Sequence, residues 1–485
     1  MIKNFKWLLL VSLTFVACNN DDEVFINPDS SDGLPLTAGS ADFSKYVALG
    51  DSFAAGFSDN ALFIEGQKGA YPNILAQQFA LVGGGAFTTP LMADNVGGFF
   101  GSTTYAPRLY LKPPTTPGGR PSPSSVALPP YNQTSSTTFA SLGGSYNNMG
   151  IPGAKVIHLD YAGYGSSLGN PYFARFASTP MATVVDDAVA MNPTFFSLWI
   201  GGNDVLGYAL SGGLNSSPIT PPATFEVAYN GLITKLTASG RKGVIANLPY
   251  VNALPYFTTV PYNPVPLDAA TASLLNSGYT TYNNGLLYAQ SLGLLSAAEV
   301  AQRTISFTAS STNRVVIEDD YLTNLTGAGI PSYRQATSED LIVLPALNFI
   351  GTTVGGNPTQ INGVSIPLSD QWVLSKKEIE EIKIATDAYN TTIQNVADAY
   401  SDQIALVDTK AVMNQLTTFG ISSNGYTLIS TFVTGGAFSL DGFHPSPRGY
   451  ALIANKFLEA INEKFGSNLK GVKFSDYRIM FPPVL

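Results

Sequence analysis

Short apolar segments that alternate with helical segments constrain the fold of this chain more than any other feature. The candidate strands are residues 46–49, 194–200, 244–247 and 404–407. Helical segments are expected between them, around residues 72–79 and 225–236. Strands that alternate with helices favour a parallel sheet with helices on both sides. The sequence therefore predicts an α/β domain with a central parallel sheet.

Two further helices have clear start signals. Ser375 and Glu378 form a capping box, after which mostly apolar residues recur at steps of three and four. These residues are Ile379, Ile382, Thr386, Tyr389, Ile393, Val396 and Tyr400. The last helix is expected after Ser446, with Pro447 in its first turn and Gly466 at its end. Packing against the core explains the apolar face of both helices.

Two long segments interrupt this alternation. Residues 97–146 are rich in Pro, Gly, Ser and Thr, and residues 252–373 are poorly periodic. Long irregular segments inside a compact domain are usually functional loops or insertions. We expect both to be insertions in one domain of residues 41–470, followed by a short tail over residues 471–485.

The first residues have the composition of a secretory signal. Two lysines precede an apolar run that is shorter than the ~20 residues needed to span a bilayer. Ala17 followed by Cys18 resembles a bacterial lipobox. This resemblance implies that residues 1–17 are a lipoprotein signal peptide and that an acylated Cys18 anchors the protein in the membrane of the bacterial cell envelope. A plain secretory signal followed by an incidental cysteine is the alternative.

Residues 18–40 lack apolar periodicity and are rich in Asp, Ser, Gly and Pro, which predicts a flexible acidic tether. The acidic run at residues 21–23 resembles the surface-export signals of lipoproteins in some Gram-negative bacteria. This resemblance implies an outer-membrane location with exposure at the cell surface. A solvated linker is the alternative interpretation of the same run.

Composition narrows the partners and the chemistry. The net charge of −9 disfavours nucleic acid as a partner, because phosphate binding needs clustered Lys and Arg. Cys18 is the only cysteine in the sequence, so the mature domain has no internal disulfide and no Cys-ligated metal. Apolar residues make up 45% of the chain and charged residues 12%, which argues for a large core and against disorder. The oligomeric state stays open.

Histidine is scarce, which limits the choice of a general base. The chain has two histidines, His158 and His444, and histidine is the commonest base near neutral pH. Asp441 lies three residues before His444, a spacing that lets a carboxylate reach the imidazole Nδ1–H in a tight loop. His158 stands in an apolar stretch, so a structural role is expected for it.

Ser52 is the candidate nucleophile. It follows the first candidate strand within the sequence Gly-Asp-Ser. A serine at the carboxyl end of a parallel strand lies at the edge of the sheet where α/β proteins bind ligands. The start of a helix there supplies N–H groups that favour a developing oxyanion. Taken alone, Gly-Asp-Ser is also an ordinary turn with a serine as helix cap.

Four segments strengthen this interpretation by their order along the chain. They are VALGDSF at residues 47–53, NMGIPGA at 148–154, LWIGGND at 198–204 and DGFHP at 441–445. In this order they resemble the four sequence blocks of the SGNH, or GDSL, hydrolase family. The resemblance covers residues 43–465 and implies a flavodoxin-like three-layer sandwich with long loop insertions. Both insertions depart from the compact members of that family, so the resemblance says least about specificity.

The resemblance also implies roles for individual residues. Ser52, His444 and Asp441 would form a catalytic triad, and Ser52 N–H, Gly153 N–H and the Asn203 amide would form the oxyanion hole. Glycine at 153 is expected because a close backbone approach leaves no room for a Cβ. Asp51 and Asp204 are expected to make local hydrogen bonds rather than to act as acids in the reaction.

These roles predict a carboxylic ester hydrolase, an esterase or lipase, that needs no metal or organic cofactor. The substrate would be a lipid or acyl-glycerol ester, or an acetyl ester on a polysaccharide. An acyltransferase of the same fold is one alternative, since an alcohol can replace water. A surface lipoprotein that binds without turnover is another, although a binding module has no need for the full set of five residues.

Overall fold

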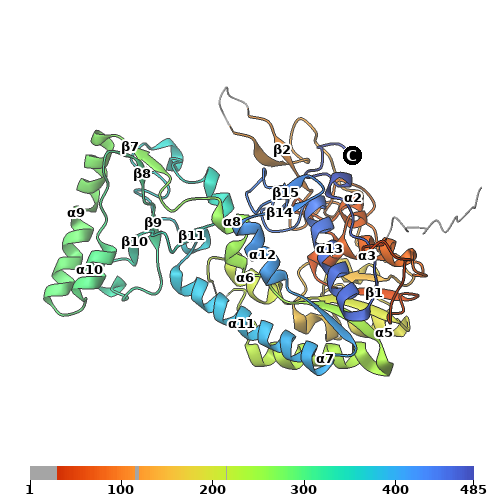
Figure 1. Ribbon diagram of the computed structural model, residues 1–485. Helices are drawn as coiled ribbons and strands as arrows, with labels where there is room; N and C mark the ends of the chain where they lie inside the picture. The colour runs from red at the N-terminus through yellow and green to blue at the C-terminus, as the bar shows by residue number, and fades with distance from the viewer. Residues whose placement is uncertain (1–29, 115–119, 215) are drawn as a thin grey trace, which may run out of the picture.

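The computed structural model describes residues 30–114, 120–214 and 216–485, and its centre is a five-stranded sheet (Figure 1). The strands are β1 (Tyr46–Gly50), β4 (Asn148–Gly150), β5 (Phe195–Trp199), β6 (Lys242–Ala246) and β13 (Ile404–Val407). All neighbouring pairs are parallel. Four of the five strands lie where the apolar segments predict them. β4 has three residues, too few to show a period.

The order of the strands determines where a ligand can bind. Across the sheet the order is β13-β6-β5-β1-β4, so the chain places β4 on one side of β1 and then returns to place β5 on the other. This is the flavodoxin-like order, in which ligands bind beyond the carboxyl ends of the strands at the point where the order reverses. Here that point lies beside β1, the strand that precedes Ser52.

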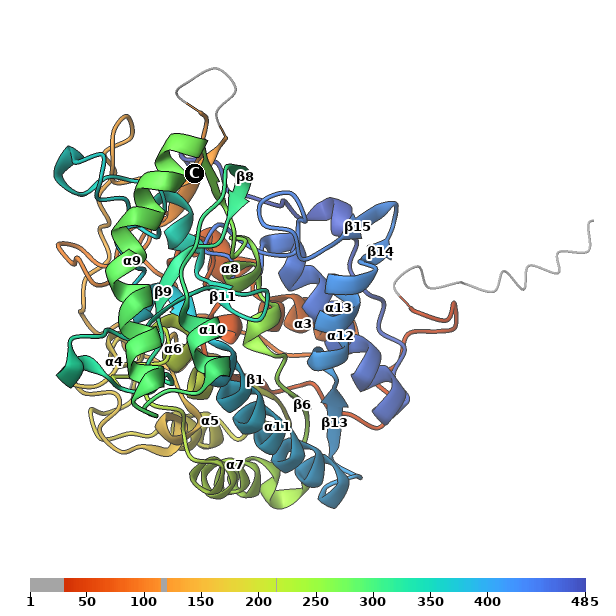
Figure 2. The same ribbon diagram turned by 90° about the vertical axis from the view of Figure 1, so that its left-hand side faces the viewer.

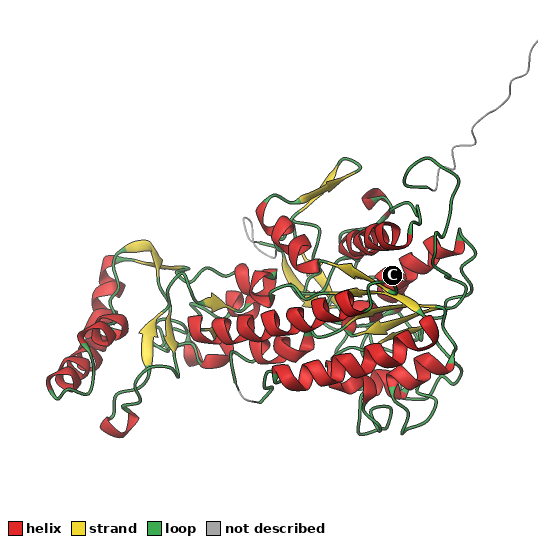
Figure 3. Ribbon diagram, turned by 60° about the horizontal axis from the view of Figure 1, so that its bottom comes forward, coloured by secondary structure: helices red, strands yellow, loops and turns green. Residues whose placement is uncertain are grey.

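Helices cover both faces of the sheet, which confirms the predicted three-layer α/β sandwich (Figures 1 and 3). The helices on one face are α5 (Val184–Ala190), α7 (Pro222–Thr237) and α11 (Lys376–Ala399). The helices on the other face are α3 (Tyr71–Ala80), α12 (Thr409–Thr418) and α13 (Pro447–Phe465). Within the sheet β1 and β5 are completely buried, as two covered faces require.

The two helices with clear start signals form as predicted. At the start of α11 Ser375 N donates a hydrogen bond to Glu378 Oε2 at 2.6 Å, one half of the capping box, and Ile382, Tyr389 and Ile393 are buried on the inner face of the helix. The Ser446 side chain accepts a hydrogen bond from Gly449 N at the start of α13, which ends at a left-handed Gly466. In both helices the caps supply partners for terminal backbone groups that the helix itself cannot pair.

Residues 97–114 and 120–146, the described parts of the first insertion, are largely irregular and contain one hairpin. The hairpin strands are β2 (Leu109–Lys112) and β3 (Ser122–Ser125). The remaining short elements before β5 are α1 (Ser52–Ala55), α2 (Ile64–Lys68), η1 (Val156–Asp160) and α4 (Pro171–Ala174). Arg108, just before β2, is fully buried and donates hydrogen bonds to the carbonyl oxygens of Pro482 and Pro483.

Residues 252–373 form a lobe beside the sandwich (Figures 1 and 2). Its helices are α8 (Pro255–Thr258), α9 (Ala269–Ser291) and α10 (Ala297–Arg303). Its strands are β7 (Val265–Leu267), β8 (Ser310–Asn313), β9 (Val316–Glu318), β10 (Tyr333–Gln335) and β11 (Leu341–Ile342), and β12 (Val373–Leu374) closes it. A buried ion-pair network, in which Arg334 bonds Asp319 and Asp340, ties the lobe together.

The chain ends of the described region pack against the sandwich. Thr37 N donates a hydrogen bond to the Asn468 side chain, Ser40 N donates to Phe465 O, and Ser30 pairs with Leu469. The expectation of a flexible tether over residues 18–40 is therefore wrong for residues 30–40, because their backbone has partners in the C-terminal segment. Residues 1–29, with the expected signal and Cys18, lie outside the described residues. Within the described residues no helix is long and apolar enough to cross a membrane.

Candidate functional site

Ser52 begins α1 directly beyond the end of β1. Asp51 caps this short helix by accepting a hydrogen bond from Phe53 N at 2.9 Å. Gly50 is needed before it, since a Cβ at that position would lie 2.5 Å from Trp199 O on the neighbouring strand. The sharp turn from strand to helix therefore places the Ser52 hydroxyl at the carboxyl edge of the sheet.

The structure brings Ser52, His444 and Asp441 together in one line of hydrogen bonds. His444 Nε2 lies 2.8 Å from Ser52 Oγ, and His444 Nδ1 lies 2.9 Å from Asp441 Oδ2. All three side chains are buried. With Nδ1–H donating to the carboxylate, Nε2 is free to accept the serine proton, which is the arrangement that activates a serine nucleophile.

The Asp441 carboxylate is held by five donors. Oδ1 accepts hydrogen bonds from Ser439 Oγ, Phe443 N and His444 N, and Oδ2 accepts from Asn60 N and His444. Burial alone raises the pKa of Asp441, but the adjacent His444 and these hydrogen bonds together bring it below the usual value. The carboxylate is therefore fixed in its charged form. Sequence reasoning missed both Asn60, whose backbone N–H is the donor, and Ser439, whose side-chain hydroxyl is the donor. A backbone donor such as Asn60 N leaves no signal in the sequence.

Three phenylalanine rings surround the imidazole of His444. The ring centroids of Phe53, Phe57 and Phe443 lie 5.5, 4.6 and 4.3 Å from the centroid of the imidazole. These rings restrict the orientation of His444 and exclude water from its flanks. Phe53 and Phe443 stand beside residues that the sequence singles out, whereas Phe57 was not predicted.

Gly153 and Asn203, the other expected oxyanion donors, lie at the same edge of the sheet. Gly153 is in the turn after β4, and Asn203 is the first residue of α6 (Asn203–Leu210) after β5. The Asn203 amide donates to Ala154 O at 3.0 Å, which joins the two segments. No atom of the described chain lies within 4 Å of where a Cβ on Gly153 would stand, so protein packing does not require glycine there. Its φ of +79° favours glycine independently of any bound substrate.

Asp51 makes the expected local hydrogen bond with Phe53 N, whereas the bonds described for Asp204 and for the second oxygen of Asp51 join distant segments. Asp51 Oδ2 accepts a long hydrogen bond of 3.4 Å from the Asn203 amide, and Asp204 Oδ2 accepts one from Val156 N. Burial raises the pKa of Asp51 to about 7 and that of Asp204 to about 6. Neither carboxylate is placed in the Ser52–His444–Asp441 line.

His158 has separate partners in η1. Its Nδ1 accepts a hydrogen bond from Lys155 N at 3.0 Å, and its ring stacks on Tyr164. Burial and the nearby Lys155 charge lower the pKa of His158, which favours the neutral imidazole. These contacts fit a structural histidine.

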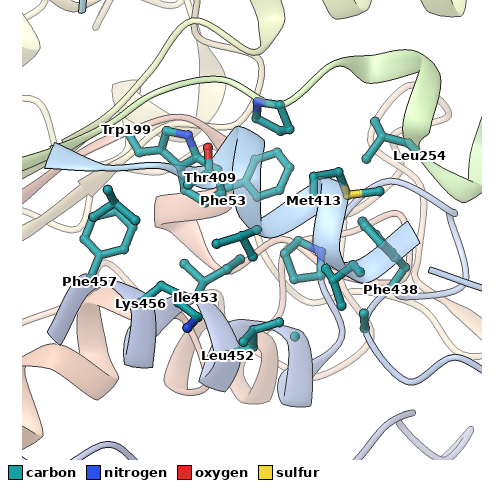
Figure 4. Close-up of a pocket in the computed structure, with 17 residues that line it drawn as sticks. Phe53, Trp199, Leu254, Thr409, Met413, Phe438, Leu452, Ile453, Lys456 and Phe457 are labelled. Carbon is teal, nitrogen blue, oxygen red and sulfur yellow. The ribbon is translucent and has the colours of Figure 1, made fainter. Parts of the chain in front are cut away.

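An apolar pocket lies between the sheet, α12 and α13 (Figure 4). Phe53, which follows Ser52 in the chain, and Pro445, which follows His444, are both part of its lining. The other lining residues include Trp199, Met413, Leu452 and Ile453. The cavity volume is about 60 Å³. By the measure in which a water needs roughly 10–15 Å³, this is room for about four waters, or a short hydrocarbon chain.

A much wider cleft opens at the Asp441 end of the site. Its volume is about 1080 Å³, and Asp441 and Phe443 form part of its wall. Both insertions contribute to it, the first through Leu109 and residues 120–123 and the second through Tyr256 and Leu344, among others. The second insertion packs directly against the loop that carries Asp441 and His444. A Cβ on Gly442 in that loop would lie 3.0 Å from Leu344 Cδ2 and 3.1 Å from Tyr256 N.

No protein-family model matches this sequence, and no curated protein is similar enough to match it. Among solved structures, the chain is similar to the crystal structure of LAE5, described as an alpha/beta hydrolase enzyme from the metagenome of Lake Arreo, Spain. The two share 12% sequence identity over 87% of this chain and 96% of that chain, with a TM-score of 0.34.

Proposed function

We propose that this protein is a serine ester hydrolase of the SGNH type. The observation that supports the proposal most strongly is the unbroken line from Ser52 Oγ through His444 to Asp441, with hydrogen bonds of 2.8 and 2.9 Å. This line lies at the point of the sheet where the strand order reverses, which is where α/β folds place their ligands.

In the proposed reaction Ser52 Oγ attacks the ester carbonyl while His444 Nε2 takes its proton. Asp441 stabilises the imidazolium, which then gives the proton to the departing alcohol. A water, deprotonated by His444, attacks the acyl-enzyme, and the acid leaves with the proton returned to Ser52. The charge that develops on the carbonyl oxygen would be met by Ser52 N–H, Gly153 N–H and the Asn203 amide. Each such donor is typically worth about 100- to 1000-fold in rate.

The apolar pocket that begins at Phe53 is proposed to hold the acyl group. Its lining is apolar apart from Thr409 and Lys456, and Lys456 is paired with Glu459 at 2.7 Å. Such a lining suits a hydrocarbon chain and gives no partner to a charged or sugar-like acyl group. Its small volume favours short chains over those of membrane lipids.

A panel of p-nitrophenyl esters from acetyl to palmitoyl tests this proposal. Each buried methylene is worth about 0.8 kcal/mol, or roughly fourfold in kcat/KM, until the pocket is full. We therefore expect kcat/KM to rise from acetyl to about hexanoyl and to fall for palmitoyl. Absence of ester hydrolysis across the whole panel would contradict the proposed function, and a maximum at palmitoyl would contradict the proposed pocket.

Two matched variants distinguish an effect of filling the pocket from the general effect of introducing a tryptophan. Ile453 lines the pocket, and Ile384 is 63% exposed on α11, which covers the opposite face of the sheet. Ile453→Trp should fill the pocket and lower kcat/KM for hexanoyl esters about tenfold, with a much smaller loss for acetyl esters. Ile384→Trp should leave the chain-length profile as it is.

The wide cleft favours a bulky alcohol portion, so an O-acetylated polysaccharide is the second candidate substrate. A cleft of about 1080 Å³ is at the upper end of what drug-sized ligands fill. Acetylated xylan, measured beside the ester panel, distinguishes the candidates by the release of acetate. Adding glycerol or a sugar as acceptor, and comparing free acid with transferred ester, tests for acyl transfer at the same site.

The proposed location is the bacterial outer membrane, through lipid on Cys18. Replacing Cys18 by serine should yield protein without lipid, because serine offers no thiol to acylate. Detergent partitioning and intact mass measure this directly. Membrane partitioning that is unchanged in the serine variant would remove the proposed anchor, while esterase activity should be the same in both proteins.

A further inference from the structure

A tight turn at Ser58–Ala61 contacts the loop that carries Asp441 and His444. Ser58 and Ala61 exchange two backbone hydrogen bonds of 3.0 Å, and the two central residues, Asp59 and Asn60, have φ of +50° and +64°. Two consecutive non-glycine residues in the left-handed region are unusual, and such backbone tends to persist at functional sites.

Four hydrogen bonds join this turn to residues 439–445. Asn60 N donates to Asp441 Oδ2 at 2.9 Å, Asp59 N donates to Ser439 Oγ at 3.0 Å, and the Ser58 hydroxyl donates to Pro445 O. In the reverse direction, Leu440 N donates to Asp59 Oδ1 at 2.9 Å. Because Ser439 in turn donates to Asp441 Oδ1, the turn reaches both oxygens of that carboxylate.

Asp59 has an unusual environment for a carboxylate. It is 1% exposed, and its Oδ2 has no hydrogen-bond partner within the described part of the chain. Burial, together with the nearby Asp441 charge, raises the pKa of Asp59 to about 7, against the opposing effects of the hydrogen bond from Leu440 N and of the Arg108 charge. A buried carboxylate of this kind beside a second one is costly to keep, and core packing alone gives no reason for it.

We infer that Asp59 is a positioning residue, which holds the 439–444 loop so that the Asp441 carboxylate faces His444 Nδ1. This inference rests on the proposed function. Asp59 would act through the hydrogen bond that its Oδ1 accepts from Leu440 N. That bond fixes the 439–444 loop against the Ser58–Ala61 turn, and Asn60 N of the same turn bonds the Asp441 carboxylate. The Asp59 side chain itself touches no reacting atom.

Two substitutions at this position test the inference. Asp59→Asn keeps a carbonyl oxygen for Leu440 N and should keep kcat within about threefold of the wild type. Asp59→Ala removes the acceptor and should lower kcat by about tenfold to a hundredfold, the range expected when a catalytic group is misplaced by up to 1 Å. KM should change little in both, because Asp59 lines neither the apolar pocket nor the wide cleft.

A control and a second position make the test decisive. Asp42 is exposed and accepts a hydrogen bond from Ser44 N in a turn away from the site, so Asp42→Ala should have wild-type kcat. Ser439→Ala removes the hydroxyl that links Asp59 N to Asp441 and should lower kcat while KM stays the same, even if Asp59→Ala does not fold. Equal kcat in the wild type, Asp59→Ala and Ser439→Ala would overturn the inference, as would an equal loss in Asp59→Asn and Asp59→Ala.

Proton NMR provides a readout that does not depend on turnover. In a His158→Ala background His444 is the only histidine, so its Nδ1 proton can be assigned without ambiguity. The resonance should stay in Asp59→Asn and shift upfield or broaden in Asp59→Ala, as the bond to Asp441 loosens. If wild-type protein hydrolyses no ester, the proposed function fails, yet this measurement still decides whether Asp59 positions Asp441. An unchanged resonance in Asp59→Ala would overturn the positioning role alone.

Discussion

Replacing Ser52 by alanine is expected to abolish ester hydrolysis while the protein stays folded. The change removes the proposed nucleophile, and the loss in kcat should be about 1000-fold or more, since the remaining groups cannot form an acyl-enzyme. The structural cost is small. One hydroxyl that hydrogen-bonds His444 is lost, worth about 1 kcal/mol, and no large cavity forms. Steady-state kinetics with p-nitrophenyl butyrate and a thermal melt measure both effects.

A covalent probe gives the control for this experiment. A fluorophosphonate reacts with an activated serine, so peptide mass spectrometry of labelled wild-type protein should find the adduct on the peptide that contains Ser52. The alanine variant should take up no label. Turnover by the variant at the wild-type rate, or a label on a different serine, would show that the nucleophile has been assigned to the wrong residue.

Replacing His444 by alanine should be as damaging as the change at Ser52, because the proposed base and the proton donor to the leaving alcohol are lost together. The chain itself supplies the matched control. His158 is the other histidine, and it stacks on Tyr164 and bonds Lys155 N. His158→Ala should therefore lower stability modestly and leave kcat near that of the wild type. Kinetics and melting curves of both variants, measured side by side, check the pair.

The opposite result has a clear meaning. If His158→Ala abolished activity without unfolding the protein, and His444→Ala did not, the base would have to be sought in η1. The kinetic result would then decide the assignment against His444, despite the 2.8 Å distance between His444 Nε2 and Ser52 Oγ.

The layers of the fold could be predicted because each rests on a local pattern. Buried parallel strands are continuous apolar runs, and α11 and α13 carry both an apolar stripe and a cap. The lobe was harder. Helix α9 is 23 residues long, yet it was not predicted, because its sequence has no charged face and is interrupted by Gly278 and Gly285. Only tertiary packing of Leu275, Leu286 and other residues reveals its inner side.

For the site too, contacts between residues close in sequence could be predicted, and contacts between distant residues could not. Asp441 and His444 are three residues apart, so their pairing can be anticipated from the sequence alone. The contributions of Asn60 and Phe57 cannot, because these residues reach Asp441 and His444 only when distant parts of the chain meet in the fold. Gly153 illustrates a further limit, since its φ of +79°, which favours glycine, becomes visible only in the folded backbone.

The contact between Ser52 and His444 joins residues that are 392 positions apart. Closing so long a stretch of chain is slow, and it becomes favourable only when the strands between them have assembled. We therefore expect the contact between Ser52 and His444 to form late in folding, after the sheet and the last helix. Recovery of the proposed esterase activity after dilution from denaturant would then report the last folding step, and a chain still in synthesis should not attack esters around it.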